Sequence, residues 1–394
     1  MNENQIPSEV HFVLESLNAA GFASFLVGGC VRNLLLGKVP KDFDICTGAR
    51  PDEVKKLFSK VIDTGIQYGT VTVLCDRLAI EVTTFRKSME CIGDGSRSNK
   101  IEFGQTAAED VQKRDFTING LLFDGEKVTD YVDGLSDLDQ KIIRAIGDPD
   151  ERIREDSLRM MRAIRLVCQL GFAIEPLTQA AICNNASLIS RVSPERIRDE
   201  LIQILLCNCP SKGFYLLHET GLLIFILPEL EKCFNFNQRN PHHSQDVFGH
   251  IMTVLENTPL DLTIRLAALL HDIGKPLTFS LGEDGVGHFY GHNLKSCELT
   301  KEILTRLKFD NKTIEKVLIL IKEHMNRLKS PGKSTLKRLI NRVGIGNVEA
   351  LLDLQIADVD RPGKKDEVKD LQDIKQQIST ILWENGPMKV SDLV

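Results

Sequence analysis

The chain has 394 residues, of which 42% are hydrophobic and 26% are charged, and its formal net charge is −6. This length exceeds one typical core and predicts two to four domains, and the composition is that of an ordinary globular protein. The negative net charge excludes binding of a polyanion over the whole surface, so a nucleic-acid partner would need a local basic surface.

The cysteine pattern and the absence of long apolar runs predict the cellular compartment of the protein. Ten cysteines occur without a CxxC pair, and Cys207 and Cys209 are the only close neighbours. This pattern indicates mostly buried thiols in a reducing compartment, and we expect a cytoplasmic protein. The segment MNENQIPSEV lacks the basic and apolar regions of a signal peptide. No apolar run approaches the roughly 20 residues of a membrane span, so we expect no membrane partner.

Hydrophobic periodicity predicts short helices and strands in the first quarter of the chain. The helices are expected at residues 7–21, 31–36 and 51–58, and the strands at 22–27, 43–46, 71–74 and 79–84. The last two strands would form an antiparallel pair. Residues 86–100 contain turn formers and charges without periodicity, which predicts a mobile loop.

Two glycines and two aspartates follow the first apolar run. Gly28 and Gly29 stand where a strand gives way to a helix, and the missing side chains let backbone N–H groups approach a phosphate. Asp42 and Asp44 are two residues apart in a strand, so both can face one divalent ion, which prefers hard oxygen ligands. Each feature alone is more often a tight turn or a solvated strand edge. Together they favour two-metal phosphoryl or nucleotidyl transfer.

Two later features could complete such a site. Glu81 lies in a predicted strand as a third carboxylate, although an ordinary solvent-facing residue fits its alternating pattern equally well. Arg114 and Asp115 in KRDFTINGLLFD could contact a triphosphate and ribose hydroxyls, respectively. Taken alone, this second patch favours an ordinary surface ion pair.

From Glu151 the sequence predicts continuous helix, with five arginines interleaved with apolar residues. A solvated charged face is one explanation of this pattern. Asp156 and Arg159, three residues apart, would adjoin on one face of that helix. A carboxylate beside a guanidinium complements the amino donor and ring-nitrogen acceptor that cytosine and adenine share, and it would refuse uracil and guanine. Such a pair could select C and A without a nucleic-acid template.

Five segments of the chain resemble, in order, the five motifs of the class II tRNA nucleotidyltransferases, which include CCA-adding enzymes and bacterial poly(A) polymerases. The segments are LVGGCVRNLLLG with DFDICT, KRDFTING, DGLSDLDQKIIRAIGDP, EDSLRMMRAIR and SPERIRDEL. The resemblance covers roughly residues 22–230. Two positions depart from the family pattern: Asn33 stands where Asp is usual after VR, and Lys113 where Arg is usual.

The resemblance implies a role for each matching residue. Asp42 and Asp44 would bind Mg²⁺ and serve catalysis. Nucleotide contacts are implied for three groups of residues: Gly28, Gly29 and Arg32 at the phosphates; Arg114, Asp115 and Asn119 at the triphosphate and ribose; and Asp156 and Arg159 at the base, supported by Glu155 and Arg162.

A second set of chemical groups begins at Pro241. His250 precedes the doublet His271-Asp272 by 21 residues, and the doublet ends a predicted helix. Imidazoles and carboxylates in this arrangement can fix metal ions and activate a bound water. The segment HDIGKP resembles the HD superfamily, which implies Asp358 as the final metal ligand.

Three further residues are candidates for this second site. His292 and His324 could bind a second ion, or they could be structural, as lone histidines at helix ends often are. Lys275 could contact a phosphate.

Together the resemblances imply an α+β protein. It would have a polymerase-β-like nucleotidyltransferase head with a mixed sheet and helices at residues 1–145, an all-α neck and body at 146–235, and a helical HD domain with C-terminal helices at 236–394. The lysines from 329 to 337 are expected to face RNA. The sequence ends at MKVSDLV, earlier than in many relatives, so we expect a tRNA-binding tail that is short or missing.

The predicted reaction is template-independent addition of CMP and AMP, from CTP and ATP, to the 3′ end of tRNA. The head would use Mg²⁺, and the HD domain would use Mg²⁺ or a divalent transition metal. Enzymes that add only CC, only A, or a poly(A) tail are alternatives. Two alternatives of other classes are an HD metal phosphohydrolase that acts on nucleotide or RNA phosphates and whose head only binds RNA, and a non-catalytic RNA-binding protein. The oligomeric state is not indicated.

Overall fold

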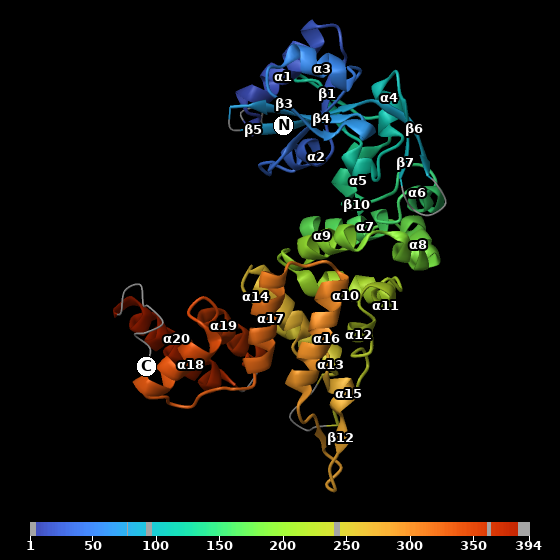
Figure 1. Cartoon of the computed structure of the whole chain (residues 1–394). Helices are drawn as coiled ribbons and strands as arrows, with labels where there is room; N and C mark the ends of the chain where they lie inside the picture. The colour runs from blue at the N-terminus through green and yellow to red at the C-terminus, as the bar shows by residue number, and fades with distance from the viewer. Residues whose placement is uncertain (1–4, 77, 92–96, 240–244, 361–363, 385–394) are drawn as a thin grey trace. The chain divides into compact units, whose positions relative to one another are not determined.

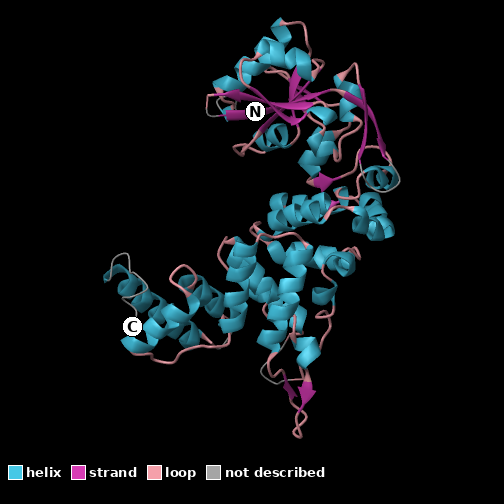
Figure 2. Cartoon of the chain, in the orientation of Figure 1, coloured by secondary structure: helices cyan, strands magenta, loops and turns pink. Residues whose placement is uncertain are grey.

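The structure is a computed structural model that describes residues 5–76, 78–91, 97–239, 245–360 and 364–384. The chain forms two compact units, residues 1–191 and 192–394 (Figure 1). The large sheet belongs to the first unit, and the second is almost entirely helical (Figure 2). The segment MKVSDLV lies outside the described residues.

A mixed seven-stranded sheet organises the described part of the first unit, in the order β3-β4-β5-β2-β1-β8-β9. Strands β2 and β5 are parallel, and the other neighbours are antiparallel. The strands are β1 (Ser24–Val27), β2 (Phe43–Thr47), β3 (Val61–Gly65), β4 (Thr70–Cys75), β5 (Leu78–Thr84), β8 (Leu122–Phe123) and β9 (Val128–Thr129). The predicted antiparallel pair is therefore confirmed as β4 and β5.

Helices of the first unit bury apolar faces against this sheet and against each other. Helix α1 (Ser8–Ala19) buries Val10, Val13, Leu14 and Leu17, the face that the sequence predicts. The other helices are α2 (Gly29–Leu35), α3 (Pro51–Leu57), α4 (Ala107–Val111), α5 (Gly134–Gln140), α6 (Pro149–Glu155), α7 (Arg159–Leu170) and α8 (Pro176–Asn185). A parallel two-residue pair joins β10 (Ile142–Ile143) to β11 (Ala173–Ile174), so the predicted neck is not purely helical.

The prediction of a loop at residues 86–100 is wrong for the residues at both of its ends. Strands β6 (Arg86–Cys91) and β7 (Arg97–Phe103) pair as an antiparallel hairpin, and residues 92–96 lie outside the described part. Backbone pairing needs no hydrophobic alternation, which is why periodicity missed it. The base of the hairpin is closed by a hydrogen bond from Gly104 N to Phe85 O, 2.7 Å long.

The continuous helix predicted from Glu151 is also wrong. Helix α6 ends at Glu155, and Asp156 has an extended backbone (φ −149°, ψ 98°) before α7 begins at Arg159. The cause is local, because Asp156 Oδ1 accepts a hydrogen bond from Leu158 N at 3.2 Å and so competes with helical bonding.

The second unit packs its helices around α14 (Leu262–Leu270). Every residue of α14 from Ile264 to Leu270 is buried, which is the pattern of a helix surrounded on all sides. Among its neighbours are α13 (Val247–Glu256), α17 (Asn311–Glu323) and α19 (Val348–Val359). The doublet at the end of α14 is consequently buried as well.

The other elements of the second unit are short helices, one small hairpin and a longer C-terminal helix. They are α9 (Pro194–Leu205), α10 (Pro210–Glu219), α11 (Leu223–Ile226), α12 (Pro228–Glu231), α15 (Lys275–Thr278), β12 (Ser280–Leu281), β13 (Gly287–His288), α16 (His292–Arg306), α18 (Lys333–Val343) and α20 (Lys365–Glu384). Within the ranges that the structure describes, no helix has the length and hydrophobicity to cross a membrane.

Candidate functional site

Three carboxylates, called the carboxylate edge below, lie on or directly beside the neighbouring central strands β2 and β5 of the head sheet. Asp44 is in β2, Asp42 directly precedes that strand, and Glu81 pairs with Asp44 in the parallel register of β5. Burial, followed by the negative charges of Glu81 and Asp42, raises the pKa of Asp44 to about 6. Carboxylates that repel each other in this way suit a divalent cation, because its charge and its preference for oxygen ligands relieve the repulsion. The chemistry of the donor set therefore fits Mg²⁺. Among the described residues, however, groups of three such side chains with ligand atoms within 4.8 Å of one another are found in the second unit and not here.

The glycine turn lies directly against this carboxylate edge. Gly28 has φ +82° and caps α2, and a Cβ atom there would meet Asp44 Oδ2 at 3.6 Å and Arg114 Nη1 at 3.8 Å. A side chain at this position would be strained and would fill the space between the carboxylate and the guanidinium. Gly29 is similarly close to Arg32, since its Cβ would lie 3.5 Å from Arg32 Nη2.

Arg32 is a buried cation held by neutral groups. Its Nη1 donates to Asn119 Oδ1 at 2.6 Å, and its Nε and Nη2 donate to Asn33 Oδ1 at 3.3 and 3.0 Å. Burial, reinforced by the nearby positive charge of Arg165, lowers the pKa of Arg32 to about 10. A guanidinium bound only to amide oxygens keeps its charge available for an anion such as a phosphate.

The same hydrogen bonds link the head to α7. Asn119 Nδ2 donates to Asp115 Oδ1 at 3.1 Å, and Arg162 Nη2 lies 2.9 Å from Asp115 Oδ2. Although burial opposes ionisation, the charge of Arg162 and these hydrogen bonds lower the pKa of Asp115 to about 2. Asp115 is thus an ionised, buried carboxylate rather than half of a surface ion pair.

Arg114 is positioned by a residue that sequence reasoning missed. Asp110 is fully buried and accepts from Arg114 Nε at 3.0 Å and Nη2 at 2.7 Å. It also accepts from the backbone N–H of Arg86 at 3.2 Å, where the β6–β7 hairpin begins. Despite burial, the charge of Asp110 raises the pKa of Arg114 above its usual value. The spacing of four residues between Asp110 and Arg114 was the available signal.

The expected pairing of Asp156 with Arg159 on one helical face is wrong, because the helix is interrupted between them. The guanidinium of Arg159 donates to Glu155 Oε2 at 3.2 Å, to Arg152 O at 2.8 Å and to Lys113 O at 3.0 Å. The base-selecting role of Asp156 and Arg159 stays a prediction of the resemblance.

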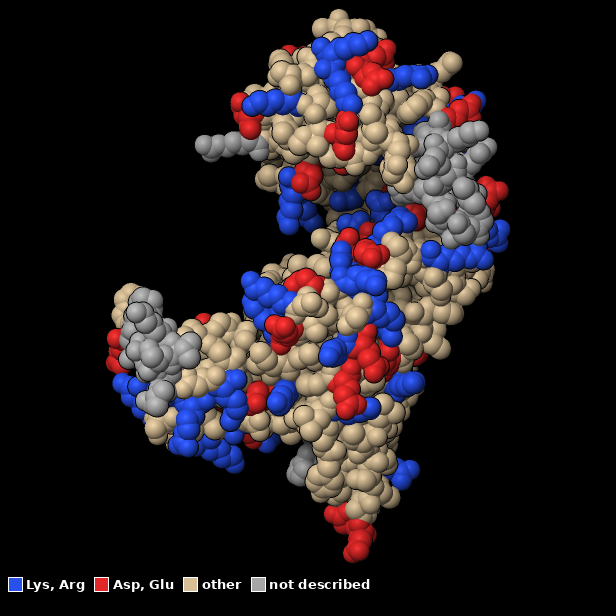
Figure 3. All heavy atoms as spheres, viewed as in Figure 1, with Lys and Arg blue, Asp and Glu red and all other residues tan. Residues whose placement is uncertain are grey.

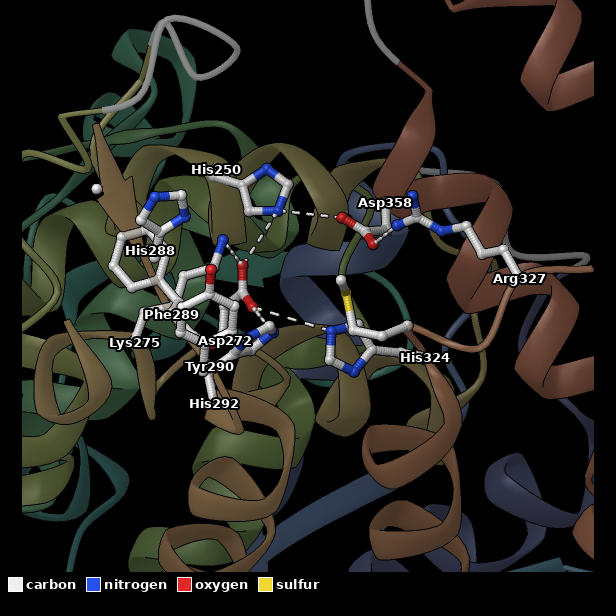
Figure 4. A pocket seen from close by; sticks show the side chains of 12 residues that line it. His250, Asp272, Lys275, His288, Phe289, Tyr290, His292, His324, Arg327 and Asp358 are labelled. Carbon is white, nitrogen blue, oxygen red and sulfur yellow. Dashed lines mark hydrogen bonds and ion pairs between the residues drawn. The ribbon is translucent and has the colours of Figure 1, made fainter. Parts of the chain in front are cut away.

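In the second unit, six histidine and aspartate side chains converge. Figure 4 shows five of them, His250, Asp272, His292, His324 and Asp358, around one pocket. They come from separate helices or from the residues that follow them: His250 from α13, His271 and Asp272 from the end of α14, His292 from α16, His324 from the end of α17 and Asp358 from α19. The structure thus brings together every residue that the sequence proposed for this site, including His292 and His324.

Three of these histidines are oriented by backbone carbonyls. The Nδ1 atoms of His271, His292 and His324 lie 2.8, 2.8 and 2.6 Å from the carbonyl oxygens of Ala268, Phe289 and Ile321, respectively. Because Nδ1 then carries the proton, the lone pair of each ring lies on Nε2. This is the usual arrangement of a metal-binding imidazole. Burial and the neighbouring His271 lower the pKa of His324 to about 4, so its ring is neutral at pH 7.

The carboxylate of Asp272 lies between two sets of imidazoles. Its Oδ2 is 3.4 Å from His250 Nε2 and 3.3 Å from His271 Nε2, whereas its Oδ1 is 3.3 Å from His292 Nε2 and 3.9 Å from His324 Nε2. Asp358 Oδ1 closes the first set at 3.1 Å from His250 Nε2. The Nε2 atoms of His271 and His292 are buried without a hydrogen-bond partner among the described residues. Buried nitrogen lone pairs without a hydrogen-bond partner suit the coordination of one or two divalent metal ions.

The cluster opens into a cavity of about 300 Å³. Cationic groups reach its carboxylates: Lys275 Nζ is 2.7 Å from Asp272 Oδ2, and Arg327 pairs with Asp358. His288 and Tyr290 also line the cavity. Sequence reasoning missed Arg327, His288 and Tyr290, because no local pattern sets them apart from ordinary surface residues.

Three segments of the chain match known protein families. Residues 24–144 match the poly A polymerase head domain, residues 171–234 match the probable RNA and SrmB-binding site of polymerase A, and residues 242–361 match the HD domain.

Curated relatives match over part of the chain. A CCA-adding enzyme of Lactobacillus johnsonii is 46% identical over 211 residues, which is 53% of each chain. A CCA-adding enzyme of Levilactobacillus brevis is 44% identical over 227 residues, or 56% of this chain and 57% of that one. The chain therefore matches only about half the length of these relatives.

Solved structures match along most of the chain. A CCA-adding enzyme of Bacillus stearothermophilus in complex with CTP has a TM-score of 0.70 and 26% identity, covering 100% of this chain and 91% of that one. A tRNA nucleotidyltransferase complexed with a primer tRNA and an ATP analog shares the fold, with a TM-score of 0.65 and 18% identity over 94% of this chain and 99% of that one. From the head through the RNA-binding segment, the chain is thus similar to the CCA-adding enzymes and poly(A) polymerases, and a match to the HD domain follows.

Proposed function

We propose that this chain is a template-independent nucleotidyltransferase that adds CMP and AMP to the 3′ end of tRNA. The observation that carries the proposal is the carboxylate edge formed by Asp42, Asp44 and Glu81, with Gly28 and Arg114 directly beside it. The relatives named CCA-adding enzymes support it for the head and the adjoining segment.

The described residues would divide the reaction between them. Asp42 and Asp44 would hold Mg²⁺, with Glu81 as a third carboxylate; when bound, the ions supply activation of the attacking hydroxyl and charge neutralisation of the leaving group. The oxygen of the RNA 3′ hydroxyl forms a bond to the α-phosphorus, the bond to the β-phosphate oxygen breaks, and pyrophosphate leaves.

Arginines around this edge would bind the triphosphate. Arg32 and Arg114 lie on either side of the glycine turn, and the ionised Asp115 would accept a hydrogen bond from a ribose hydroxyl. Asp156 and Arg159, supported by Glu155 and Arg162, would select cytosine and adenine.

Domain limits of 1–145, 146–235 and 236–394 and a cytoplasmic location belong to the same proposal. Nine cysteines within the described residues are free thiols, which is compatible with a reducing compartment.

A basic surface of the second unit could hold RNA despite the net charge of −6. Lysine and arginine side chains gather over α18 (Figure 3), whose sequence KSTLKRLINRV carries Lys333, Lys337, Arg338 and Arg342. Lys329 precedes the same helix. Such clusters bind phosphate backbones without reading sequence, and the affinity should fall as salt rises.

The test is incubation of a tRNA transcript that ends before CCA with the purified protein, Mg²⁺, and CTP alone, ATP alone or both. We expect two added nucleotides with CTP and three with both. Addition of A to a transcript ending in CC, without any addition of C, would indicate an A-adding enzyme. A long A tail would replace the proposal with a poly(A) polymerase.

We propose phosphoester hydrolysis as a second function, located at the HD site. The buried Nε2 atoms of His271 and His292 and the adjoining cavity favour it. In this reaction a water oxygen bonds to phosphorus, the ester P–O bond breaks, and the alcohol leaves with a proton as phosphate is released. Release of phosphate from small phosphomonoesters with Mg²⁺, Mn²⁺ or Ni²⁺, and its loss in Asp272→Asn, tests this function.

A further inference from the structure

An aromatic side chain stands exposed at the opening of the HD cavity. Tyr290 is 78% exposed although it lines the same cavity as Asp272, His292 and His324. One side of its ring is backed by His288, whose ring is nearly parallel (13°) with a centroid distance of 5.4 Å. The rest of the ring is open to solvent, so it offers a flat, unused face beside the metal-binding cluster.

The backbone that carries Tyr290 is anchored on both sides. Phe289 packs on Phe279, with ring centroids 5.7 Å apart, and Lys275 Nζ lies 5.4 Å from the Phe289 ring centroid. At Gly287 a Cβ atom would lie 2.2 Å from Gln238 O, so this strand is pressed against its neighbour. These contacts anchor the backbone on which Tyr290 stands.

The same segment orients a candidate metal ligand. Phe289 O is the carbonyl that lies 2.8 Å from His292 Nδ1, and Tyr290 is the next residue along the chain. The exposed ring and the imidazole are therefore positioned by one short piece of backbone. A group stacked on Tyr290 would have a defined location relative to the metal-binding atoms.

From this geometry we propose that Tyr290, backed by His288, stacks against a nucleobase, so that the HD site selects phosphoesters of nucleosides over those of simple alcohols. The inference rests on the proposed phosphohydrolase function. A cavity of about 300 Å³ is at the small end for ligand sites. It would take the phosphate and sugar, with the base resting on the exposed ring. Met325, which is 51% exposed and also lines the cavity, adds apolar surface for the base.

The test compares substrates that differ only in the base. The rate of phosphate release is measured for 5′-AMP, 3′-AMP and glycerol phosphate with the wild-type protein and with Tyr290→Ala and Tyr290→Phe. Loss of one stacked base costs about tenfold in affinity. We therefore expect Tyr290→Ala to raise KM for at least one AMP isomer about tenfold and to leave KM for glycerol phosphate unchanged. Tyr290→Phe should behave as the wild type, since it keeps the flat ring.

Tyr131→Ala is the matched control, because Tyr131 is a half-exposed tyrosine (50%) of the first unit. Equal changes in KM for AMP and glycerol phosphate in Tyr290→Ala, or no change for either, would overturn the proposal. If no substrate is hydrolysed with Mg²⁺, Mn²⁺ or Ni²⁺, the phosphohydrolase function itself fails. Calorimetric binding of the two AMP isomers to the metal-loaded protein then decides on the stacking. A tenfold loss in Tyr290→Ala supports it, and unchanged binding overturns it.

Discussion

The two candidate metal sites of this chain are built in opposite ways. In the head, the donors are carboxylates of the neighbouring central strands β2 and β5, where Asp42 and Glu81 are exposed and Asp44 is half-buried. In the second unit, four imidazoles and two carboxylates come from separate helices, and His271 and Asp272 are 0% and 2% exposed. Hard oxygen donors suit Mg²⁺, which keeps several waters, whereas imidazoles suit transition metals. The donor sets therefore predict different metals and separable activities.

The largest expected effect tests the carboxylate edge. Replacing Asp44 by Asn removes a charged metal donor next to the glycine turn, so nucleotidyl transfer should fall by at least about 10²-fold, the scale for losing one group that stabilises transition-state charge. Single-turnover addition of CMP to tRNA measures the change. Asp52→Asn, an exposed aspartate of α3, should leave the rate within twofold, and a comparable loss there would contradict the assignment.

Metal binding by the HD cluster gives the next effect. The two oxygens of Asp272 face separate imidazole sets, so we expect two Ni²⁺ or Mn²⁺ ions per chain in equilibrium dialysis with metal analysis. His292→Ala should lower the stoichiometry to one. Asp44→Asn should leave it unchanged. A wild-type stoichiometry of one, unaltered by His292→Ala, would limit the site to a single ion.

Stability should depend on pH through Asp115, which links the head to α7. The pKa of its carboxyl is about 2 in the fold, against an ordinary value of 3.8. Ionised Asp115 therefore stabilises the protein above pH 4, and this contribution is lost as pH falls toward 2. Asp115→Asn should lower the free energy of unfolding by about 2 kcal/mol at pH 7.

Chemical denaturation at pH 7, 5 and 3 measures this difference. It should be nearly equal at pH 7 and 5 and fall to about half at pH 3. A difference between the two proteins that does not change with pH would rule out the ionised, paired Asp115.

The smallest effect concerns Asn33, where the sequence departs from the motif that it otherwise resembles. An Asp at this position would pair with Arg32 and reduce its charge toward a triphosphate, so Asn33→Asp should raise KM for CTP and ATP severalfold with little change in kcat. Lys113→Arg, the other departure, is the control. The backbone carbonyl of Lys113 contacts Arg159, so this substitution should have no effect. A lower KM in Asn33→Asp would show that Asn33 weakens nucleotide binding.

Much of the head site could be predicted because its parts are local. A period of two puts Asp42 and Asp44 on one strand face, and two neighbouring glycines mark the strand-to-helix turn. The prediction that Asp156 and Arg159 lie on one continuous helix failed because a side-chain hydrogen bond from Asp156 to the backbone interrupts the helix, which periodicity does not register. The hairpin at residues 86–103 was missed because its pairing depends on backbone contacts.

The HD site could be predicted only in part because its residues come from distant helices. His250 and the doublet stood out by spacing, and Asp358 followed only from resemblance. Whether His292 and His324 join the cluster depends on how α16 packs on α17 and how α17 packs on α14, which no local pattern fixes. Arg327 and Tyr290 could not be predicted either, because only the folded cavity that they line sets them apart from other residues.

One experiment addresses the separation of the two sites most directly. Nucleotide addition to tRNA lacking CCA and phosphate release from phosphomonoesters are measured on the same preparations of Asp42→Ala and His271→Ala. We predict that Asp42→Ala loses nucleotide addition and keeps phosphate release, and that His271→Ala does the reverse. Nucleotide addition that survives Asp42→Ala and disappears in His271→Ala would contradict the account.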